Sequence, residues 1–295
     1  MTQRTVARFI GARTSRSAFM SDERTGRSAL RRDLRADPFP AVAEAAATGE
    51  TASLFGDIRA TIGVRVVNLV WRHLATMDGA LPWAWGALKP IYLEGIADRA
   101  TIRFRETMQL PDLGSLAGPE PASVDAVLAS YDHSNTINLF TLAALVAWLR
   151  GDVAPAGTAE KGPRLAAPDV VLPNLASEGE VAHETWQRVL RLNRFGDSAE
   201  PLILASMYRH LAHAPAFLER LEAALAPVQA DGSLDRAIAV NREAAAKQGR
   251  VLARAIVAAR PQAADKIERS VSAFVDHAIG KMVTICRAVR LARIL

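Results

Sequence analysis

The sequence predicts an all-α protein whose two halves are degenerate copies of one helical unit, forming an intramolecular pseudo-dimer. Three observations predict this fold. Apolar residues recur at three- and four-residue spacing along most of the chain, no segment alternates apolar and polar residues over the length of a strand, and short motifs recur at a fixed offset. With 295 residues, of which 50% are hydrophobic, the chain can bury a sizeable core.

The helical periodicity falls in segments that Pro and Gly separate. These segments are 51–62, 66–76, 96–108 and 124–149 in the first half, and 180–192, 202–213, 216–226, 234–259 and 265–295 in the second. Gly and Pro gather in the joins at 79–82, 111–121 and 214–215. The predicted organisation is an N-terminal extension (1–36), a first repeat (37–150), a Pro- and Gly-rich linker (151–173) and a second repeat (174–295).

The first 36 residues differ in composition from the rest. They hold nine arginines and three carboxylates, a net charge of +6, so the other 259 residues sum to −1 in a chain of net charge +5. A basic segment with few apolar residues predicts disorder. A targeting segment and a nucleic-acid-binding arm are the alternatives. The near-neutral remainder predicts no nucleic-acid partner.

Cysteine usage and hydropathy limit the setting of the protein. Cys286 is the only cysteine, which excludes an intramolecular disulfide, a Cys-x-x-Cys redox pair and a cysteine-rich zinc site, and favours a reducing, cytoplasmic location. The longest apolar stretch, 139–149, is far shorter than the ~20 residues that cross a bilayer. We expect no membrane partner.

The duplication is visible as repeated motifs. The motif Arg-His-Leu-Ala occurs at 72–75 and again at 209–212, an offset of 137 residues. At the same offset Trp71 matches Tyr208, Leu81 matches Leu218 and Pro90 matches Pro227. Upstream, Gly49-Glu50 matches Gly179-Glu180, and downstream Asp132-His133 matches Asp276-His277. Two such copies would cover each other's apolar faces. A site at their interface would be lined by residues of both copies.

The Asp-His pairs are the candidates for acid–base chemistry. We expect Asp276, His277 and His133 to supply a general base, with the Asp of one copy orienting the His of the other. The alternative is that these groups satisfy one another structurally across the interface. A metal site is disfavoured because no recognisable ligand spacing is present. The paired His73 and His210 are expected to be structural.

Taken together, these residues resemble the group I, or D,L-type, 2-haloacid dehalogenases. The matching features, in chain order over 40–295, are Gly49-Glu50, Asp57-Ile58-Arg59, Leu74-Ala75-Thr76, Asn135 before an apolar helix, Leu211 to Pro215 and Leu225 to Val228. The resemblance implies an all-helical pseudo-dimer without a cofactor. It also implies hydrolysis of short 2-halocarboxylic acids by direct attack of a water that an Asp activates.

The resemblance also implies a substrate pocket. The Ser of the family falls on Ser206, the Asn on Asn135 and the catalytic Asp on Met207, with Val66 and Leu69 expected among the apolar lining. A thioether cannot accept a proton, so this register predicts a missing base.

Three functions remain open from the sequence. The first is a dehalogenase-type hydrolase or a diverged relative that binds a small carboxylic acid. The second is a non-catalytic helical protein that kept the pocket, and the third is an enzyme of other chemistry that uses His133 or His277. A homo-oligomer is compatible with each of them.

Deleting residues 1–36 is expected to leave the melting temperature within about 2 °C, because that arm offers too little apolar surface to offset the entropy of ordering it. Calorimetry of the full and shortened chains measures this shift. A loss of many degrees would mean that the arm packs on the body.

Overall fold

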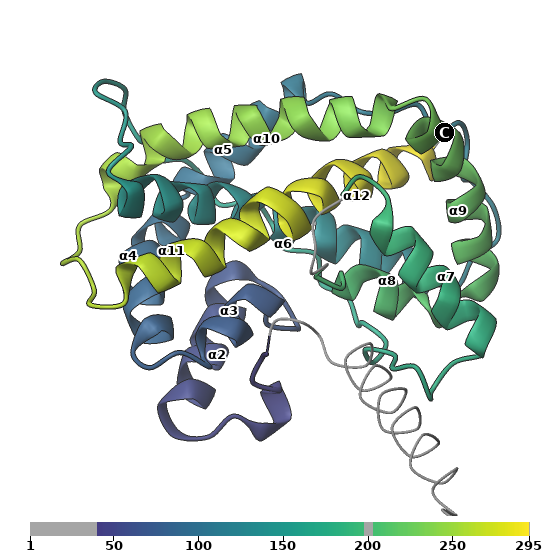
Figure 1. Ribbon diagram of the computed structural model, residues 1–295, viewed down its shortest axis with the longest axis horizontal. Helices are drawn as coiled ribbons and strands as arrows, with labels where there is room; N and C mark the ends of the chain where they lie inside the picture. Colours follow the sequence, from purple (N-terminus) through teal and green to yellow (C-terminus); the bar gives the residue numbers. More distant parts are fainter. Residues whose placement is uncertain (1–39, 198–202, 295) are drawn as a thin grey trace, which may run out of the picture. The chain divides into compact units, whose positions relative to one another are not determined.

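The computed structural model describes residues 40–197 and 203–294 (Figure 1). Its elements are η1 (Glu44–Ala46), α2 (Gly49–Ile62), α3 (Leu69–Leu74), α4 (Ala80–Leu93), α5 (Ile96–Thr107), α6 (Ala122–Arg150), α7 (His183–Arg194), α8 (Ser206–Leu211), α9 (Pro215–Ala230), α10 (Ser233–Leu252), η2 (Ala253–Ala255), α11 (Ala264–Ala273), the π-helix η3 (Phe274–Ile279) and α12 (Gly280–Ala292). No strand occurs in these ranges, so the predicted all-α class is confirmed. The predicted arm at 1–36 lies outside the described residues.

Helix α6 is the element around which the others pack. It contacts α5, α8, α10, α11, η3 and α12 (Figure 1). The residues from Asp132 to Ala147 are buried without interruption, although they include Ser134, Asn135 and Asn138. A helix this deeply buried must find partners inside the protein for each of its polar side chains.

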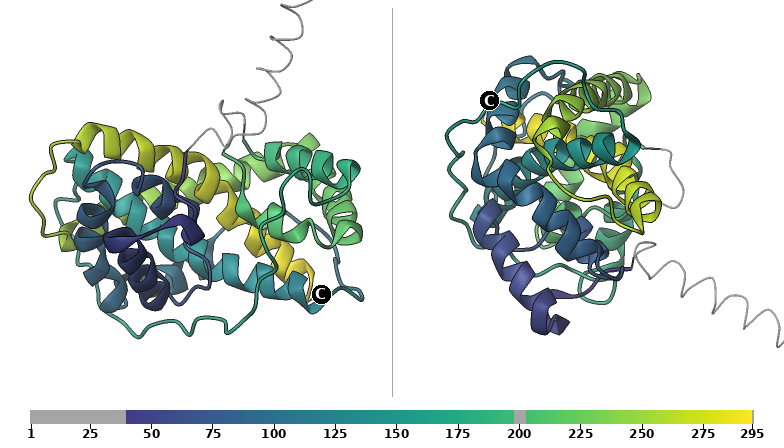
Figure 2. Two further views of the ribbon diagram at one scale, coloured as in Figure 1. Left: turned by 90° about the horizontal axis from the view of Figure 1, so that it is seen from below. Right: turned by 90° about the vertical axis from the view of Figure 1, so that its left-hand side faces the viewer.

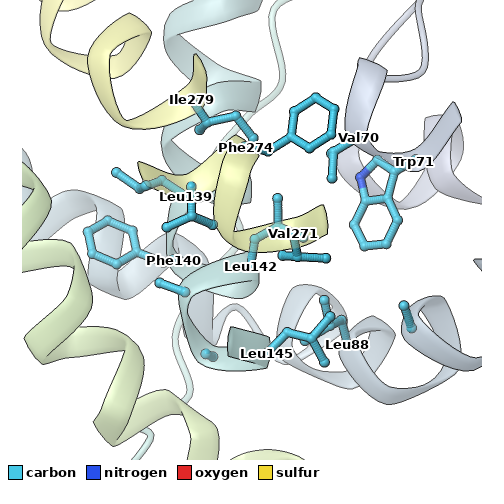
Figure 3. Close-up of a cluster of buried hydrophobic side chains, with 14 of the residues drawn as sticks. Val70, Trp71, Leu88, Leu139, Phe140, Leu142, Leu145, Val271, Phe274 and Ile279 are labelled. Carbon is cyan, nitrogen blue, oxygen red and sulfur yellow. The ribbon is translucent and has the colours of Figure 1, made fainter. Parts of the chain in front are cut away.

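The hydrophobic residues form two cores, and each core takes residues from both sequence halves. The first core contains residues of helices α2, α3, α4 and α5 and of the carboxyl-terminal part of α6. Residues of α11 and η3, from the second half, complete it. Figure 3 shows Val271 and Phe274 of the second half among Val70, Trp71 and Leu88 of the first. The second core contains residues of helices α7, α8, α9 and α12. From the first half it includes Val124, Val127 and Leu128 at the start of α6. Helix α6, and the continuous run from α11 through η3 to α12, therefore each contribute residues to both cores.

Matched hydrogen bonds support the predicted duplication, which we keep as an inference. His73 Nδ1 lies 2.7 Å from the Pro40 carbonyl oxygen, and His210 Nδ1 lies 2.7 Å from that of Pro173. Downstream, α4 and α9 each contain a proline near the end and lead into a glycine of positive φ, Gly95 at 65° and Gly232 at 74°. These glycines differ by 137 residues, which is the offset of the Arg-His-Leu-Ala motif.

Two expectations from the sequence are wrong. Gly49 begins α2, whereas Gly179 and Glu180 lie in a turn before α7, so this pair does not occupy equivalent places. Helix α4 was not expected, because 79–82 looked like a join. Pro82 is tolerated because it lies in the first turn, where a backbone N–H has no intrahelical partner.

The linker connects the halves as an extended segment held by polar contacts (Figure 2). Its Gly162 N–H donates to the Glu94 carbonyl oxygen, and its Leu165 N–H donates to Asp98 Oδ1 at 2.8 Å. These contacts make the linker part of the packed body. Among the described helices, none is long and apolar enough to cross a membrane.

Asn138 is the polar centre of the first core. Its Oδ1 accepts hydrogen bonds from Trp71 Nε1 at 3.1 Å and from the Tyr92 hydroxyl at 2.8 Å, while its Nδ2 donates to Asn68 Oδ1 at 3.1 Å. One fully buried side chain thereby joins α3, α4 and α6.

The substitution Asn138→Ala is expected to lower the free energy of unfolding by roughly 2–4 kcal/mol, because an unsatisfied buried donor costs about 1–3 kcal/mol and a small cavity adds to this. Urea denaturation measures the loss. The control is Ser53→Ala, which removes a hydrogen bond at an exposed site and is expected to stay within about 0.5 kcal/mol of the wild type. Equal losses for the two variants would contradict the role of Asn138.

Candidate functional site

A cavity of about 60 Å³ lies where α3, α6, α8 and η3 meet. This is several times the ~10–15 Å³ that one water needs on the same measure. The lining comes from both sequence halves and consists of Val66, Val67, Asn68, Leu69, Val70, Ser130, Tyr131, Ser134, Asn135, Leu172, Ile203, Leu204, Ala205, Ser206, Met207, Phe274, Ala278, Ile279 and Met282. A few polar groups set in an apolar lining are typical of small-molecule sites.

All five residues predicted to bind substrate belong to this lining: Val66, Leu69, Asn135, Ser206 and Met207. Val66 and Leu69 come from the start of α3 and the loop before it, Asn135 from α6, and Ser206 and Met207 from the first turn of α8. The structure thus brings together residues that are up to 141 positions apart in the sequence, from 66 to 207.

The polar side chains of the cavity lining are serine hydroxyls, asparagine amides and the phenol of Tyr131. Asn68 Nδ2 donates to Ser134 Oγ at 3.3 Å, which connects the cavity wall to the Asn138 network. The Asn135 side chain is 6% exposed and makes no hydrogen bond to another described residue. Its amide group is therefore available to a ligand in the cavity.

Tyr131 supplies a phenol to the same wall. It lies four residues before Asn135, so both side chains occupy one face of α6. Burial raises the pKa of Tyr131, and a hydrogen bond with Ser206 only partly opposes this. The phenol stays protonated near neutral pH and can donate a hydrogen bond, but it cannot serve as a base there.

Met207 occupies the position where the resemblance places a catalytic Asp. Its side chain is fully buried, and a thioether has no site for a proton. Among the described residues, the lining contains no carboxylate and no imidazole. The described part of the cavity therefore lacks a general base.

The three residues predicted to be catalytic do not line the cavity. His133 Nε2 lies 3.0 Å from the Ile62 carbonyl oxygen, and burial lowers the pKa of this imidazole. His277 Nδ1 lies 3.2 Å from Asp197 Oδ1, and Asp276 is exposed to solvent. We therefore give Asp276, His277 and His133 no part in the proposed chemistry.

The expected Asp-His pairing between the copies is also wrong. Asp132 Oδ2 instead accepts hydrogen bonds from Arg105 at 3.1 Å, Arg287 at 3.2 Å and Arg290 at 2.6 Å. Asp132 follows the lining residue Tyr131 by one position, a rotation of about 100° along α6, and its side chain lies outside the cavity lining against these arginines.

The π-helix η3 forms the floor of the cavity through Phe274, Ala278 and Ile279. Its wide turn depends on Gly280, because a Cβ there would clash with the Val275 carbonyl oxygen. The sequence analysis took 265–295 as one continuous α-helix and did not predict this π-turn. Single π-turns inside α-helices occur often at functional sites.

Asn68 and Tyr131 are lining residues that the sequence analysis missed. A usable signal existed for Tyr131, since the i, i+4 spacing places it on the face of Asn135. No comparable signal existed for Leu172, because its place in the lining depends on the path of the linker.

Solved structures of D-2-haloacid dehalogenase share this fold. A mutant of that enzyme in complex with D-2-CPA aligns with a TM-score of 0.65 and 19% identity, over 86% of this chain and 96% of that chain. The enzyme in complex with L-LA aligns with a TM-score of 0.64 at the same identity and coverage. No protein-family model matches the sequence, and neither does any curated protein. At this identity the likeness shows the fold alone.

The protein contains three tyrosines, and burial raises the pKa of each one: Tyr92, Tyr131 and Tyr208. We expect no tyrosinate absorbance in the folded protein at the ordinary tyrosine pKa of about 10. An ultraviolet titration of the native protein, with the protein in denaturant as control, measures this. A native titration that follows the denatured curve would contradict the burial of the phenols.

Proposed function

We propose that this protein is a diverged relative of the 2-haloacid dehalogenases and that its cavity takes a short 2-substituted carboxylic acid. The observation that carries the proposal is the cavity lining. Asn135, Ser206, Val66 and Leu69, which the resemblance assigns to the substrate pocket, line one cavity. The shared fold supports the proposal, because structures of that fold were solved with D-2-CPA and with L-LA.

Neutral donors hold the acid in this proposal. The Asn135 amide and the Ser206 hydroxyl donate to the carboxylate oxygens, and Tyr131 can add a third hydrogen bond. Hydrogen bonds to a charged acceptor are stronger than those between neutral groups. Val66, Leu69 and Phe274 surround the substituent on C2, where an apolar wall suits a halogen or a methyl group.

Hydrolytic dehalogenation is the reaction proposed for this cavity. A water oxygen attacks C2, the bond between C2 and the halogen breaks, and the halide leaves with the bonding electrons. The water loses one proton, and the products are a 2-hydroxy acid, a halide ion and that proton. A base lowers the barrier by taking the proton as the bond forms. With Met207 in place we expect little halide release.

A binding protein without turnover is the second candidate function. The absence of a carboxylate or imidazole from the described lining favours it. Under this candidate the wild type binds 2-chloropropionate reversibly and releases no halide. Equilibrium dialysis together with halide detection separates the two candidates.

The substitution Met207→Asp is expected to create halide release from 2-chloropropionate or to raise it by about 10²- to 10⁴-fold, the usual contribution of a positioned base. A halide assay on purified wild-type and variant proteins measures the gain. The variant is expected to be less stable, since a carboxylate replaces a fully buried thioether.

The matched control is Met282→Asp, which makes the same substitution elsewhere in the same lining. It should not raise halide release, because a carboxylate there stands away from the position that the resemblance assigns to the base. His277→Ala is a second control and should leave activity unchanged. The proposal fails if Met207→Asp is folded, binds the acid and releases no more halide than the wild type.

A further inference from the structure

Lys281 is a lysine with no exposed surface, and it stands beside the cavity wall. It directly precedes the lining residue Met282 on α12. Its Nζ donates a hydrogen bond of 2.5 Å to the Asn193 carbonyl oxygen of α7 and lies 3.9 Å from Asp197 Oδ2. Burying an ammonium group is strongly unfavourable unless it is paired and hydrogen-bonded, so this placement requires a reason.

Asn193 connects Lys281 to the cavity lining through hydrogen bonds of its side chain. Its side chain is buried, its Oδ1 accepts the Ala205 N–H at 2.9 Å, and its Nδ2 donates to the Ile203 carbonyl oxygen at 3.1 Å. Ile203 and Ala205 both line the cavity, and Ser206 follows directly. A continuous chain of hydrogen bonds thus runs from Lys281 through Asn193 to the wall that carries Ser206 and Met207.

The predicted duplication places no lysine at the matching position of the first half. At the offset of 144 residues that relates Asp132-His133 to Asp276-His277, Lys281 corresponds to Ile137. Ile137 is buried in the first core and has no charge to balance. The charged contact therefore belongs to the second half alone, next to the residues proposed to hold the acid.

The charges around Lys281 come from three elements. Asp197 follows α7, Arg242 lies on α10, and Asp276 and His277 lie on η3. Arg242 Nη2 donates to the His277 carbonyl oxygen at 3.4 Å. Burial lowers the pKa of Lys281 to about 8, with Asp197 opposing the shift and Arg242 adding to it. The ammonium form therefore predominates at neutral pH.

We propose that Lys281 is a positioning residue for the cavity: through Asn193 it fixes the segment Ile203–Ala205 and thereby the places of Ser206 and residue 207. The role in acid binding rests on the proposed function, whereas the structural effect on the wall does not. A charge-assisted hydrogen bond is shorter and about twice as strong as a neutral one, which suits a support that must hold a wall in place.

The test is amide hydrogen exchange without any added acid, on wild type, Lys281→Met and Asn193→Ala. The Ala205 amide reports the contact directly, because it donates to Asn193 Oδ1. We expect its exchange to become at least tenfold faster in both variants, while amides of α2 stay unchanged. The matched control is Lys89→Met, which removes a partly exposed lysine paired with Asp57 and should leave Ala205 unaffected. Unchanged protection of Ala205 in folded Lys281→Met and Asn193→Ala overturns the proposal.

A double variant separates positioning from simple neutralisation of Asp197. If Lys281 only balanced that carboxylate, Lys281→Met with Asp197→Asn would restore Ala205 protection, and this outcome also overturns the proposal. We expect no restoration, since the hydrogen bond to the Asn193 carbonyl oxygen is still missing.

The effect on binding is measured with 2-chloropropionate as the probe. In the wild type we expect the Kd to rise as the pH passes about 8, where Lys281 loses its proton and its hydrogen bond to Asn193 weakens. In Lys281→Met we expect a higher Kd than in the wild type at neutral pH, and no further rise of the Kd near pH 8. A wild type that does not bind the acid contradicts the proposed function alone, because the exchange experiment still decides the role of Lys281. A pH step of equal size in Lys281→Met overturns the positioning role.

Discussion

The burial of helix α6 is the constraint on which the rest of the structure depends. This helix serves both cores, so polar residues in its middle cannot reach bulk water and must be satisfied within the protein. Asn138 is satisfied by Trp71 and Tyr92, whereas Asp132 binds three arginines through Oδ2 and its buried Oδ1 has no hydrogen-bond partner among the described residues. Asn135 faces a cavity instead. The candidate site therefore lies where one buried amide of α6, that of Asn135, has no hydrogen-bond partner among the described residues.

The sequence was sufficient for the fold class, because the three- and four-residue periodicity of a buried helix is a local property. The equivalence of α3 and α8 stays a prediction, which the Arg-His-Leu motif shared by the two helices supports. The hydrogen-bond partners of the buried side chains could not be predicted from the sequence. The arginines that bind Asp132 come from α5 and α12, and nothing in the neighbourhood of Asp132-His133 indicates them. The path of the linker past the cavity is likewise a tertiary property.

Under the predicted duplication, the two halves differ in how they satisfy their buried polar groups. At the offset of 144, Asn138 corresponds to Met282, and at 137, Trp71 corresponds to Tyr208. The Trp71 N–H has its partner in Asn138, whereas the Tyr208 hydroxyl is buried without a hydrogen-bond partner among the described residues. In the second half the lysine at 281 takes the place of an apolar residue. If the halves arose by duplication, divergence concentrated around the cavity rather than in the helix frame.

A neutral cavity constrains how an acid can be held. A carboxylate that leaves water loses several kcal/mol of hydration, and neutral donors recover only part of this. Among the described lining residues there is no cation to supply the remainder. The charge of Lys281, which is buried next to the lining residue Met282, lies outside the lining itself. Its attraction for a carboxylate in the cavity is screened less by the low dielectric of the interior than it would be by water. Under the proposed function, Met207 at the position of an aspartate leaves out a repulsive charge as well as a base, so the change that would cost hydrolysis would favour binding of the acid.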